Sequence, residues 1–303
     1  MNNFKSFLLF ELEVSNMKKS LFISNEEMKE LVNNIDEQLV QFIKDGKYKD
    51  VLLLMGNISK YSLTNQLYIF AQMNTAKTVK GLKEWNAFNR TIKKGEKAIR
   101  VLAPIKKTFI KEKKENGNII KERVKNIVGY KYSYVFDISQ TEGEELKTFA
   151  INKNISVDNK NQIIERITSF VNKKGYEICY VNKEMLGDGC YGQCRYKEKR
   201  IYILDNMSNL EEISTLIHEC AHALAHSPYK EGFEGLLLTP TRDIKEVEAE
   251  SIACIVCAYL GLDIKESSFS YILSWASGDI KKFRNNIEVI SFYAKEIINC
   301  LLS

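Results

Sequence analysis

Apolar residues recur at helical spacing over residues 28–42, which predicts an amphipathic helix near the start of the chain. Ser24 followed by Glu27 is the pattern of a capping box for the N-terminus of this helix, and Gly46 marks its end. A second helical stretch is expected over residues 63–73. The ordered part of the chain is therefore expected to begin with two helices.

A β-hairpin is predicted in the next segment. Residues 99–103 read as a strand that ends at Pro104, and Asn116-Gly117 is the strongest two-residue turn signal in the sequence. The returning strand is expected over about residues 119–138.

Four aromatic side chains of the returning strand share one face, because successive strand residues point to opposite sides. Beside basic residues they offer stacking surfaces to unpaired bases, each worth ~1 to 3 kcal/mol. The alternative is that this face packs into the core, and the sequence alone favours that alternative. The four residues are Tyr130, Tyr132, Tyr134 and Phe136.

The second half of the chain reads as a separate α+β domain. Residues 140–161 are polar and acidic without a hydrophobic period, so the domain boundary is placed there. A helix near residues 162–173 and strands near 176–181 and 200–204 are followed by mostly helical sequence. The expected organisation is a disordered extension at 1–16, a basic α+β domain over 17–140, a linker over 141–160 and a second domain over 161–303.

Composition indicates an ordinary cytoplasmic protein. The 303 residues are 45% apolar and 27% charged, and no segment approaches the roughly 20 apolar residues of a membrane span. The apolar run at residues 7–10 is too short for a secretory signal. The seven cysteines follow no disulfide framework, so they are expected to be buried thiols, the single CxxC of Cys254 and Cys257 included.

Charge is divided unevenly along the chain. Residues 51–135 hold 18 Lys and Arg against 5 Asp and Glu, whereas residues 136–303 hold 19 against 25. A concentrated basic block favours binding to a polyanion, and single-stranded DNA is the expected partner; a solvated basic surface is the alternative. The candidate contacts are Arg90, Lys93, Lys94, Lys97 and Arg100 around a turn, and Lys111, Lys113 and Lys114 in the hairpin.

The sequence HECAH, His218 to His222, is an HExxH motif on a predicted helix. Histidines four residues apart project from one face and can both reach one zinc ion, while Glu219 can take a proton from a water that the ion acidifies. His226 lies ~12 Å from His218 along the helix. It is expected to be a helix-end residue outside the ligand set, and its replacement by alanine is expected to leave zinc nearly intact.

A catalytic zinc site needs a third protein ligand. Residues 245–261 are predicted to form a helix that begins with three glutamates, of which Glu246 and Glu250 share a face and Glu248 points elsewhere. Glu246 is the expected third ligand of one zinc per chain, and Glu250 is expected to orient a ligating imidazole. The alternative for these glutamates alone is a charged first turn that complements the helix dipole.

These motifs resemble known families. HECAH followed by ExxxE resembles the gluzincin branch of zinc metallopeptidases, and KEVEAESIA resembles the second signature of ImmA/IrrE-like metallopeptidases, although related zincins often carry Asn or Asp at the position of Glu250. The N-terminal half resembles the ArdC-type antirestriction module. The matching stretches are Tyr61 to Gln72, Val79 to Pro104 and Val135 to Gly143, and the whole likeness covers roughly residues 40–280.

The resemblance implies a single-stranded-DNA-binding domain joined to a zincin domain, in a protein of plasmids and other mobile elements. Peptide hydrolysis with Glu219 as base is the expected activity, on a protein substrate that the sequence does not identify. Tyr202, Tyr229 and His226 are candidate oxyanion donors, and the strand at 200–204 is expected to offer its edge to a substrate peptide. The rival interpretation is a DNA-coating antirestriction protein whose metal site is structural or regulatory.

Overall fold

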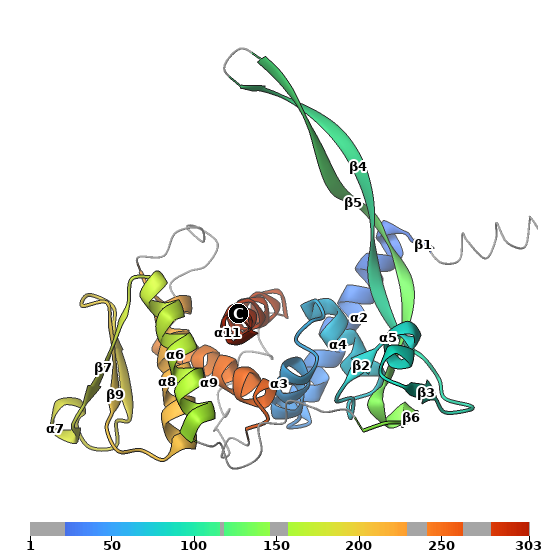
Figure 1. Ribbon diagram of the computed structural model, residues 1–303. Helices are drawn as coiled ribbons and strands as arrows, with labels where there is room; N and C mark the ends of the chain where they lie inside the picture. Colours follow the sequence, from blue (N-terminus) through green and yellow to red (C-terminus); the bar gives the residue numbers. More distant parts are fainter. Residues whose placement is uncertain (1–21, 116–117, 146–156, 229–240, 263–279, 303) are drawn as a thin grey trace, which may run out of the picture. The chain divides into compact units, whose positions relative to one another are not determined.

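The computed structural model describes residues 22–115, 118–145, 157–228, 241–262 and 280–302 (Figure 1). The chain divides into two compact units, one formed by residues 1–35 and 79–144, the other by residues 36–78 and 145–303. Both units combine helices with strands, which confirms the predicted α+β class.

The first unit is organised around one long strand, β5 (Asn118–Asp137). Strand β4 (Ile99–Glu115) pairs with β5 along its length, and β1 (Phe22–Ile23) and β2 (Val79–Lys80) also pair with β5 in antiparallel register. The smaller elements are α5 (Leu82–Ala87), β3 (Arg90–Ile92), the 3₁₀ turn η1 (Ile138–Gln140) and β6 (Thr141–Gly143), with β3 paired to β6.

The predicted hairpin is confirmed as a long two-stranded ribbon (Figure 1). Pairing runs from Ile99 opposite Val135 to Glu115 opposite Asn118, so the strands flank the turn as expected, while residues 116–117 lie outside the described residues. The expectation that the first strand ends at Pro104 was wrong: Pro104 is paired with Tyr130, and an edge strand such as β4 tolerates a proline. The register shifts between Ile105 and Lys106, which is the signature of a β-bulge.

The aromatic face of β5 is only partly exposed. At the base of the ribbon, Ile99, Val101 and Val135 on the other face are 4–5% exposed, whereas Tyr134 is 52% exposed. Tyr130, Tyr132 and Phe136 share the face of Tyr134 and are half-buried, and Leu102, which is paired with Tyr132, is 7% exposed. The core interpretation therefore fails for Tyr134 but not for the whole aromatic face.

The second unit contains a three-stranded sheet in the order β7-β9-β8. Strand β9 (Arg200–Leu204) lies in the middle, parallel to β7 (Glu177–Val181) and antiparallel to β8 (Gly192–Arg195). Both edges of residues 200–204 are therefore occupied, and the expectation that this strand offers an edge to a peptide was wrong. Strand β8 is the edge strand on the side of helix α8.

Helices make up the rest of the second unit. Helix α9 (Arg242–Tyr259) is packed against α3, α8 and α11, and its stretch from Ser251 to Cys257 is buried. Because residues on all sides of this stretch are apolar or small, it can accept neighbours around most of its circumference. The other helices are α2 (Asn25–Lys44), α3 (Tyr48–Asn57), α4 (Leu63–Gln72), α6 (Val157–Lys173), α7 (Lys183–Leu186), α8 (Asn209–Ala225) and α11 (Ile280–Leu302).

Residues 36–78 group with the second unit, although we expected a continuous first domain over residues 17–140. The Tyr48 hydroxyl lies 2.9 Å from Ser251 Oγ in a buried hydrogen bond, and Arg284 Nη2 donates to Thr64 Oγ1 at 3.0 Å. The break after Glu144 falls inside the predicted linker. Long-range packing, which local sequence pattern does not report, decides where α3 and α4 belong.

All seven cysteines lie in described segments and are free thiols, as expected, but only Cys220, Cys254 and Cys257 are buried. Cys254 and Cys257 are 1% and 0% exposed on α9, where burial raises the pKa of the Cys254 thiol to about 12. A buried protonated thiol is a poor metal ligand. Among the described helices, none is long and apolar enough to span a membrane.

The contact between α3 and α9 depends on Gly56. A Cβ at this position would lie 2.4 Å from the carbonyl oxygen of Ile255 and 2.8 Å from Ala258 Cβ. We therefore expect Gly56→Ala to lower the free energy of unfolding of the second unit by about 1 to 3 kcal/mol, measured by urea titration. Gly129→Ala is the matched control, because its new Cβ would meet only Ile105 Cδ1 at 3.9 Å. Equal stability of the two variants would contradict this close approach of the helices.

Candidate metal centre and basic surface

Helix α8 presents the HExxH motif because its other face is firmly buried. Ser208 caps the helix, its side chain accepts from the Glu211 N–H, and the Glu211 carboxylate accepts from the Ser208 N–H, as in a capping box. The buried stripe consists of Ile213, Leu216, Ile217 and Cys220, each 0% exposed. This packing fixes the rotation of the helix and turns the histidines toward α9.

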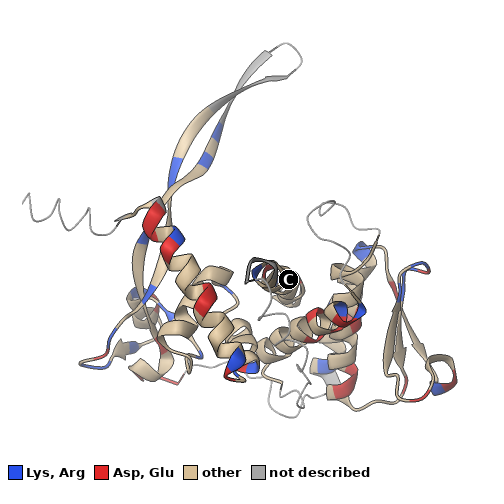
Figure 2. Cartoon of the chain, turned by 180° about the vertical axis from the view of Figure 1, so that it is seen from behind, with Lys and Arg blue, Asp and Glu red and all other residues tan. Residues whose placement is uncertain are grey.

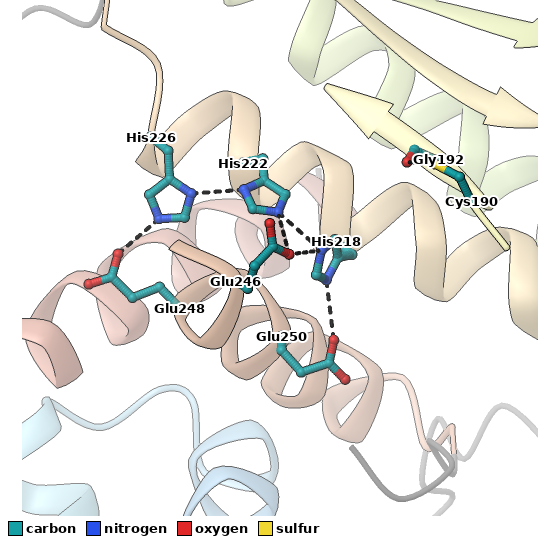
Figure 3. Close-up of polar contacts among 8 residues, drawn as sticks. All are labelled: Cys190, Gly192, His218, His222, His226, Glu246, Glu248 and Glu250. Atoms are coloured by element: carbon teal, nitrogen blue, oxygen red, sulfur yellow. Dashed lines mark hydrogen bonds and ion pairs between the residues drawn. The ribbon is translucent and has the colours of Figure 1, made fainter. Parts of the chain in front are cut away.

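Three predicted ligand residues converge on one point (Figure 3). His218 Nε2 and His222 Nε2 lie 3.1 Å apart, and Glu246 Oε2 lies 3.6 Å from the first and 3.4 Å from the second. Ligand atoms around a tetrahedral zinc ion at 2.0–2.1 Å are separated by about 3.3 to 3.4 Å. The donor set therefore fits an ion of this size without rearrangement.

Glu250 occupies a different position from Glu246. Its Oε2 atom lies 3.3 Å from His218 Nδ1, on the side of the imidazole away from the converging Nε2 atoms. A carboxylate at Nδ1 fixes the ring orientation and leaves Nε2 as the ligating atom. The geometry thus places Glu246 and Glu250 where the sequence assigned them.

The charges of the candidate ligands favour the binding of a cation. Burial lowers the pKa of His218, but hydrogen bonds to Glu246 and Glu250 outweigh it and raise this pKa to about 10. Hydrogen bonds from His218 and His222 hold the pKa of Glu246 well below its usual range. In the metal-free protein a proton on His218 is therefore favoured, and a bound metal must displace it.

Glu219 lies between α8 and the edge strand β8 and is 7% exposed. Burial raises the pKa of its carboxyl group, while the nearby histidines and the Cys194 N–H partly oppose this shift. The close approach of β8 requires Gly192, because a Cβ there would lie 2.8 Å from Glu219 Cγ and 2.7 Å from Thr215 Cγ2. A raised pKa suits a group that must accept a proton near neutral pH.

A cavity of about 720 Å³ opens onto the cluster. Strand β8, helix α8 and the first turns of α9 line it, and Tyr191, Tyr196 and Lys245 contribute side chains together with the predicted ligands. A cavity of this size with convergent polar groups is typical of a substrate site.

The structure does not support Tyr202 as an oxyanion donor and indicates a different tyrosine. The Tyr202 hydroxyl donates to Glu198 at 2.7 Å and the residue is 4% exposed, so it is already committed elsewhere. Tyr229 lies outside the described residues. Tyr196, which sequence reasoning missed, lines the cavity, and burial raises the pKa of its hydroxyl so that it stays a hydrogen-bond donor.

The sequence did not predict the contact that two residues, His226 and Glu248, make behind the motif. His226 Nδ1 lies 3.0 Å from His222 Nδ1, and His226 Nε2 lies 2.8 Å from Glu248 Oε2 (Figure 3). The side chains of His226 and Glu248 are 0% and 3% exposed. Glu248 points away from Glu246, as predicted, but its carboxylate contacts His226. The four-residue spacing of the three histidines was the sequence feature that could have indicated a role for His226.

Among the basic candidates, Arg90 is part of the interior. Its guanidinium donates to Thr141 Oγ1 at 2.8 Å, to Thr141 O at 3.0 Å and to Gly143 O at 3.3 Å, and it is 9% exposed. These bonds hold β6 against β3, so Arg90 is not a surface contact for DNA. Sequence could not show this because the acceptors lie about 50 residues further along the chain.

The other basic candidates near the turn are exposed: Lys93, Lys94, Lys97 and Arg100, of which Lys93 also donates to Ser139 O at 2.8 Å. Lys111, Lys113 and Lys114 lie in β4, and their side chains are outside what the structure describes. Figure 2 shows Lys and Arg along the part of the ribbon above its base that is not drawn in grey.

Cations and aromatic rings meet on the open face of the first sheet. The Arg100 guanidinium lies over the Tyr132 ring at 5.6 Å, and Arg100 is paired in register with the exposed Tyr134. Lys80 lies over Phe88 at 4.7 Å, and Phe88 is 47% exposed. Lys80 and Phe88 were not among the sequence candidates, because only the pairing of β2 with β5 brings them to this face.

Comparisons with known proteins agree with this arrangement. Residues 23–136 match the family model described as the N-terminal domain of anti-restriction factor ArdC. An uncharacterized Bacillus anthracis protein, pXO2-81, is 27% identical over 313 residues, which cover 91% of this chain and 51% of the relative. The chain thus spans about half the length of that curated relative.

Two crystal structures of the antirestriction protein ArdC from the R388 plasmid, one metal-free and one Mn(II)-bound, have a similar fold. Their TM-scores are 0.55 and 0.54 at 15% sequence identity, with 89% of this chain and 97% of theirs covered. Residues 23–136 therefore resemble the ArdC N-terminal domain, and most of the chain has a fold similar to that of ArdC.

Proposed function

We propose that this protein is a DNA-binding zinc metallopeptidase that acts in antirestriction for a mobile element. The observation that carries the proposal is the convergence of His218, His222 and Glu246 beside a buried Glu219 in an open cavity. The similarity to an antirestriction protein from the R388 plasmid supports the biological setting. The catalytic and DNA-binding parts of the proposal rest on the geometry argued below.

Zinc is the metal that this donor set favours. Two imidazoles and one carboxylate form a common catalytic zinc set, and the donor separations match tetrahedral geometry at short bonds. The similar R388 ArdC structure is described with Mn(II), so the fold tolerates a divalent ion at least in that protein. Bound zinc would acidify a water molecule and polarise the peptide carbonyl.

The protein's own groups divide the remaining work. The Glu219 carboxylate accepts a proton from the attacking water and returns it to the leaving nitrogen. Burial of Glu219 against β8 limits its motion and raises its affinity for that proton. The Tyr196 hydroxyl, which lines the same cavity, is the proposed donor to the developing oxyanion.

Strand β8 offers the binding edge for an extended peptide. Among the described strands it pairs with β9 alone, and its residues from Gly192 to Cys194 line the cavity. Main-chain hydrogen bonds along such an edge would position a substrate without demanding a specific side chain. This role replaces the one predicted for residues 200–204.

Single-stranded DNA is the proposed ligand of the open sheet face in the first unit. Exposed Tyr134 and Phe88 supply surfaces for base stacking. Lys80 lies over the Phe88 ring, and Arg100, which is paired with Tyr134 in the sheet, lies over the neighbouring Tyr132 ring. Stacking without base-edge contacts recognises unpaired strands of any sequence. A protein that only coats DNA, with a structural or regulatory metal, is the second candidate, because the same basic surface would serve it.

We expect one zinc per chain, measured by elemental analysis of purified protein. His218→Ala, His222→Ala and Glu246→Ala should each remove most of it, because each deletes one of three protein ligands. Glu250→Ala should weaken binding by about 10- to 100-fold without abolishing it, since this residue orients a ligand. If Glu250→Ala abolishes zinc and Glu246→Ala does not, the two glutamates have exchanged roles.

The Glu219→Gln variant distinguishes a metallopeptidase from a protein that only coats DNA. This variant should keep its zinc, because Glu219 is not a ligand, and should lose peptide hydrolysis and the protection of incoming DNA from restriction. Glu184→Gln, an exposed change on α7, is the matched control and should leave both unchanged. Full protection by the Glu219→Gln protein would favour the DNA-coating candidate.

The aromatic and basic face predicts how DNA affinity responds to mutation and salt. In the full chain, Tyr134→Ala should weaken single-stranded DNA binding by about 1 to 3 kcal/mol through lost stacking. Arg100→Glu should also weaken it and reduce the slope of log affinity against log salt by about 0.7. Lys197→Glu, an exposed change in the second unit, is the control. Salt-independent binding would identify the basic block as a solvated surface.

A further inference from the structure

A third histidine stands directly behind the proposed metal ligands. All three histidines of the chain lie at four-residue intervals, His218 and His222 on α8 and His226 at its C-cap. The ring of His226 does not face the point where the ligand atoms converge; its Nδ1 atom lies 3.0 Å from Nδ1 of His222, on the opposite side of that ring from Nε2. His226 therefore contacts the proposed metal ligands through the Nδ1 atom of His222.

Glu248 determines which ring nitrogens of His226 and His222 carry a hydrogen. An ionised carboxylate only accepts hydrogen bonds, so His226 Nε2, 2.8 Å from Glu248 Oε2, must carry the hydrogen. The Nδ1 atom of a neutral His226 is then an acceptor, and His222 Nδ1 must donate to it. His222 Nε2 is left with its lone pair directed toward Glu246 and His218, which is the tautomer that can bind a metal through Nε2.

Helix capping does not explain this pair. The backbone N–H of His226 already bonds to the His222 carbonyl at 3.0 Å, and any residue could supply that bond. Next to it, the Ser227 hydroxyl accepts from Tyr176 at 2.8 Å and fastens the helix end to the start of β7. Burying a carboxylate and an imidazole beneath this end costs stability that two apolar side chains would not.

The two proposed imidazole ligands are supported in different ways. His218 is held by Glu250, whose side chain is 34% exposed, in one direct contact. His222 is held by a two-link path through His226 to Glu248, with both side chains at most 3% exposed. Because water cannot compete at these buried links, the path holds one tautomer and one ring orientation more firmly than an exposed contact can.

We infer that Glu248 and His226 are positioning residues that fix the tautomer and orientation of His222 and thereby raise its affinity for the metal. The inference rests on the metal site of the proposed function. It reverses the sequence-based expectation that His226 could be replaced without loss of zinc, since that expectation considered only direct ligation.

The first test measures metal affinity of the full chain by competition with a chelator. Glu248→Gln should lower zinc affinity by about 10- to 100-fold. Its amide can donate to His226 Nε2, so that the hydrogen of His226 moves to Nδ1 and that of His222 moves to Nε2, the proposed ligating atom. His226→Ala should lower zinc affinity at least as much. His226→Asn should restore part of the loss, since its side-chain oxygen can accept from His222 Nδ1 in place of the ring nitrogen.

The second test reads the tautomers directly. With three histidines in the chain, nitrogen-15 NMR of the zinc-loaded protein should show His226 as the neutral Nε2–H form and His222 with hydrogen on Nδ1. In Glu248→Gln the His226 signals should shift toward the other tautomer. A change that only loosened the fold would broaden signals without exchanging these forms.

Each outcome is decisive. Unchanged zinc affinity in Glu248→Gln, or hydrogen on Nδ1 of His226 in the unmutated protein, overturns the inference. Failure of the unmutated protein to bind zinc overturns the proposed metal site instead. Circular dichroism of the metal-free variants checks folding, and if His226→Ala is unfolded, the Glu248→Gln and His226→Asn pair carries the test.

Discussion

The site depends on the packing of helix α8 against helix α9. The buried stripe of α8 fixes the direction in which His218 and His222 point, and the buried stretch of α9 fixes the direction of Glu246. Successive helical residues differ by about 100°, so a shift of one residue in either helix would separate the three ligand atoms. The apolar contacts between α9 and its neighbours α3, α8 and α11 therefore determine the metal geometry, although none of them touches the metal site.

This packing also concentrates negative charge. Glu219, Glu246 and Glu250 all lie around His218 and His222; Glu219 is buried, whereas the Glu246 and Glu250 side chains, which line the cavity, are 53% and 34% exposed. Like charges gathered so closely repel one another unless a cation balances them. The raised pKa of His218 and the lowered pKa of Glu246 are the response of the metal-free chain, and a divalent ion would supply the same balance with two charges.

Local patterns predicted the elements and the grouping of the candidate ligands, because helical spacing alone places His218 and His222 on one face. The hairpin followed from a two-residue turn signal, and its described strands agree within one residue at the turn. Features that depend on distant contacts were missed: the interior role of Arg90, the edge position of β8, and the membership of residues 36–78 in the second unit. The link from Glu248 to His226 belongs to the same class, since it requires α9 to return alongside α8.

The account is tested most directly by X-ray absorption at the zinc edge of the metal-loaded full chain. It predicts a first shell of nitrogen and oxygen only, at about 2.0 to 2.1 Å, with the multiple-scattering signature of two imidazoles. A sulfur contribution near about 2.3 Å would assign the metal to cysteine thiolates instead. A shell with fewer than two imidazoles would likewise contradict the convergence of His218 and His222 on one ion.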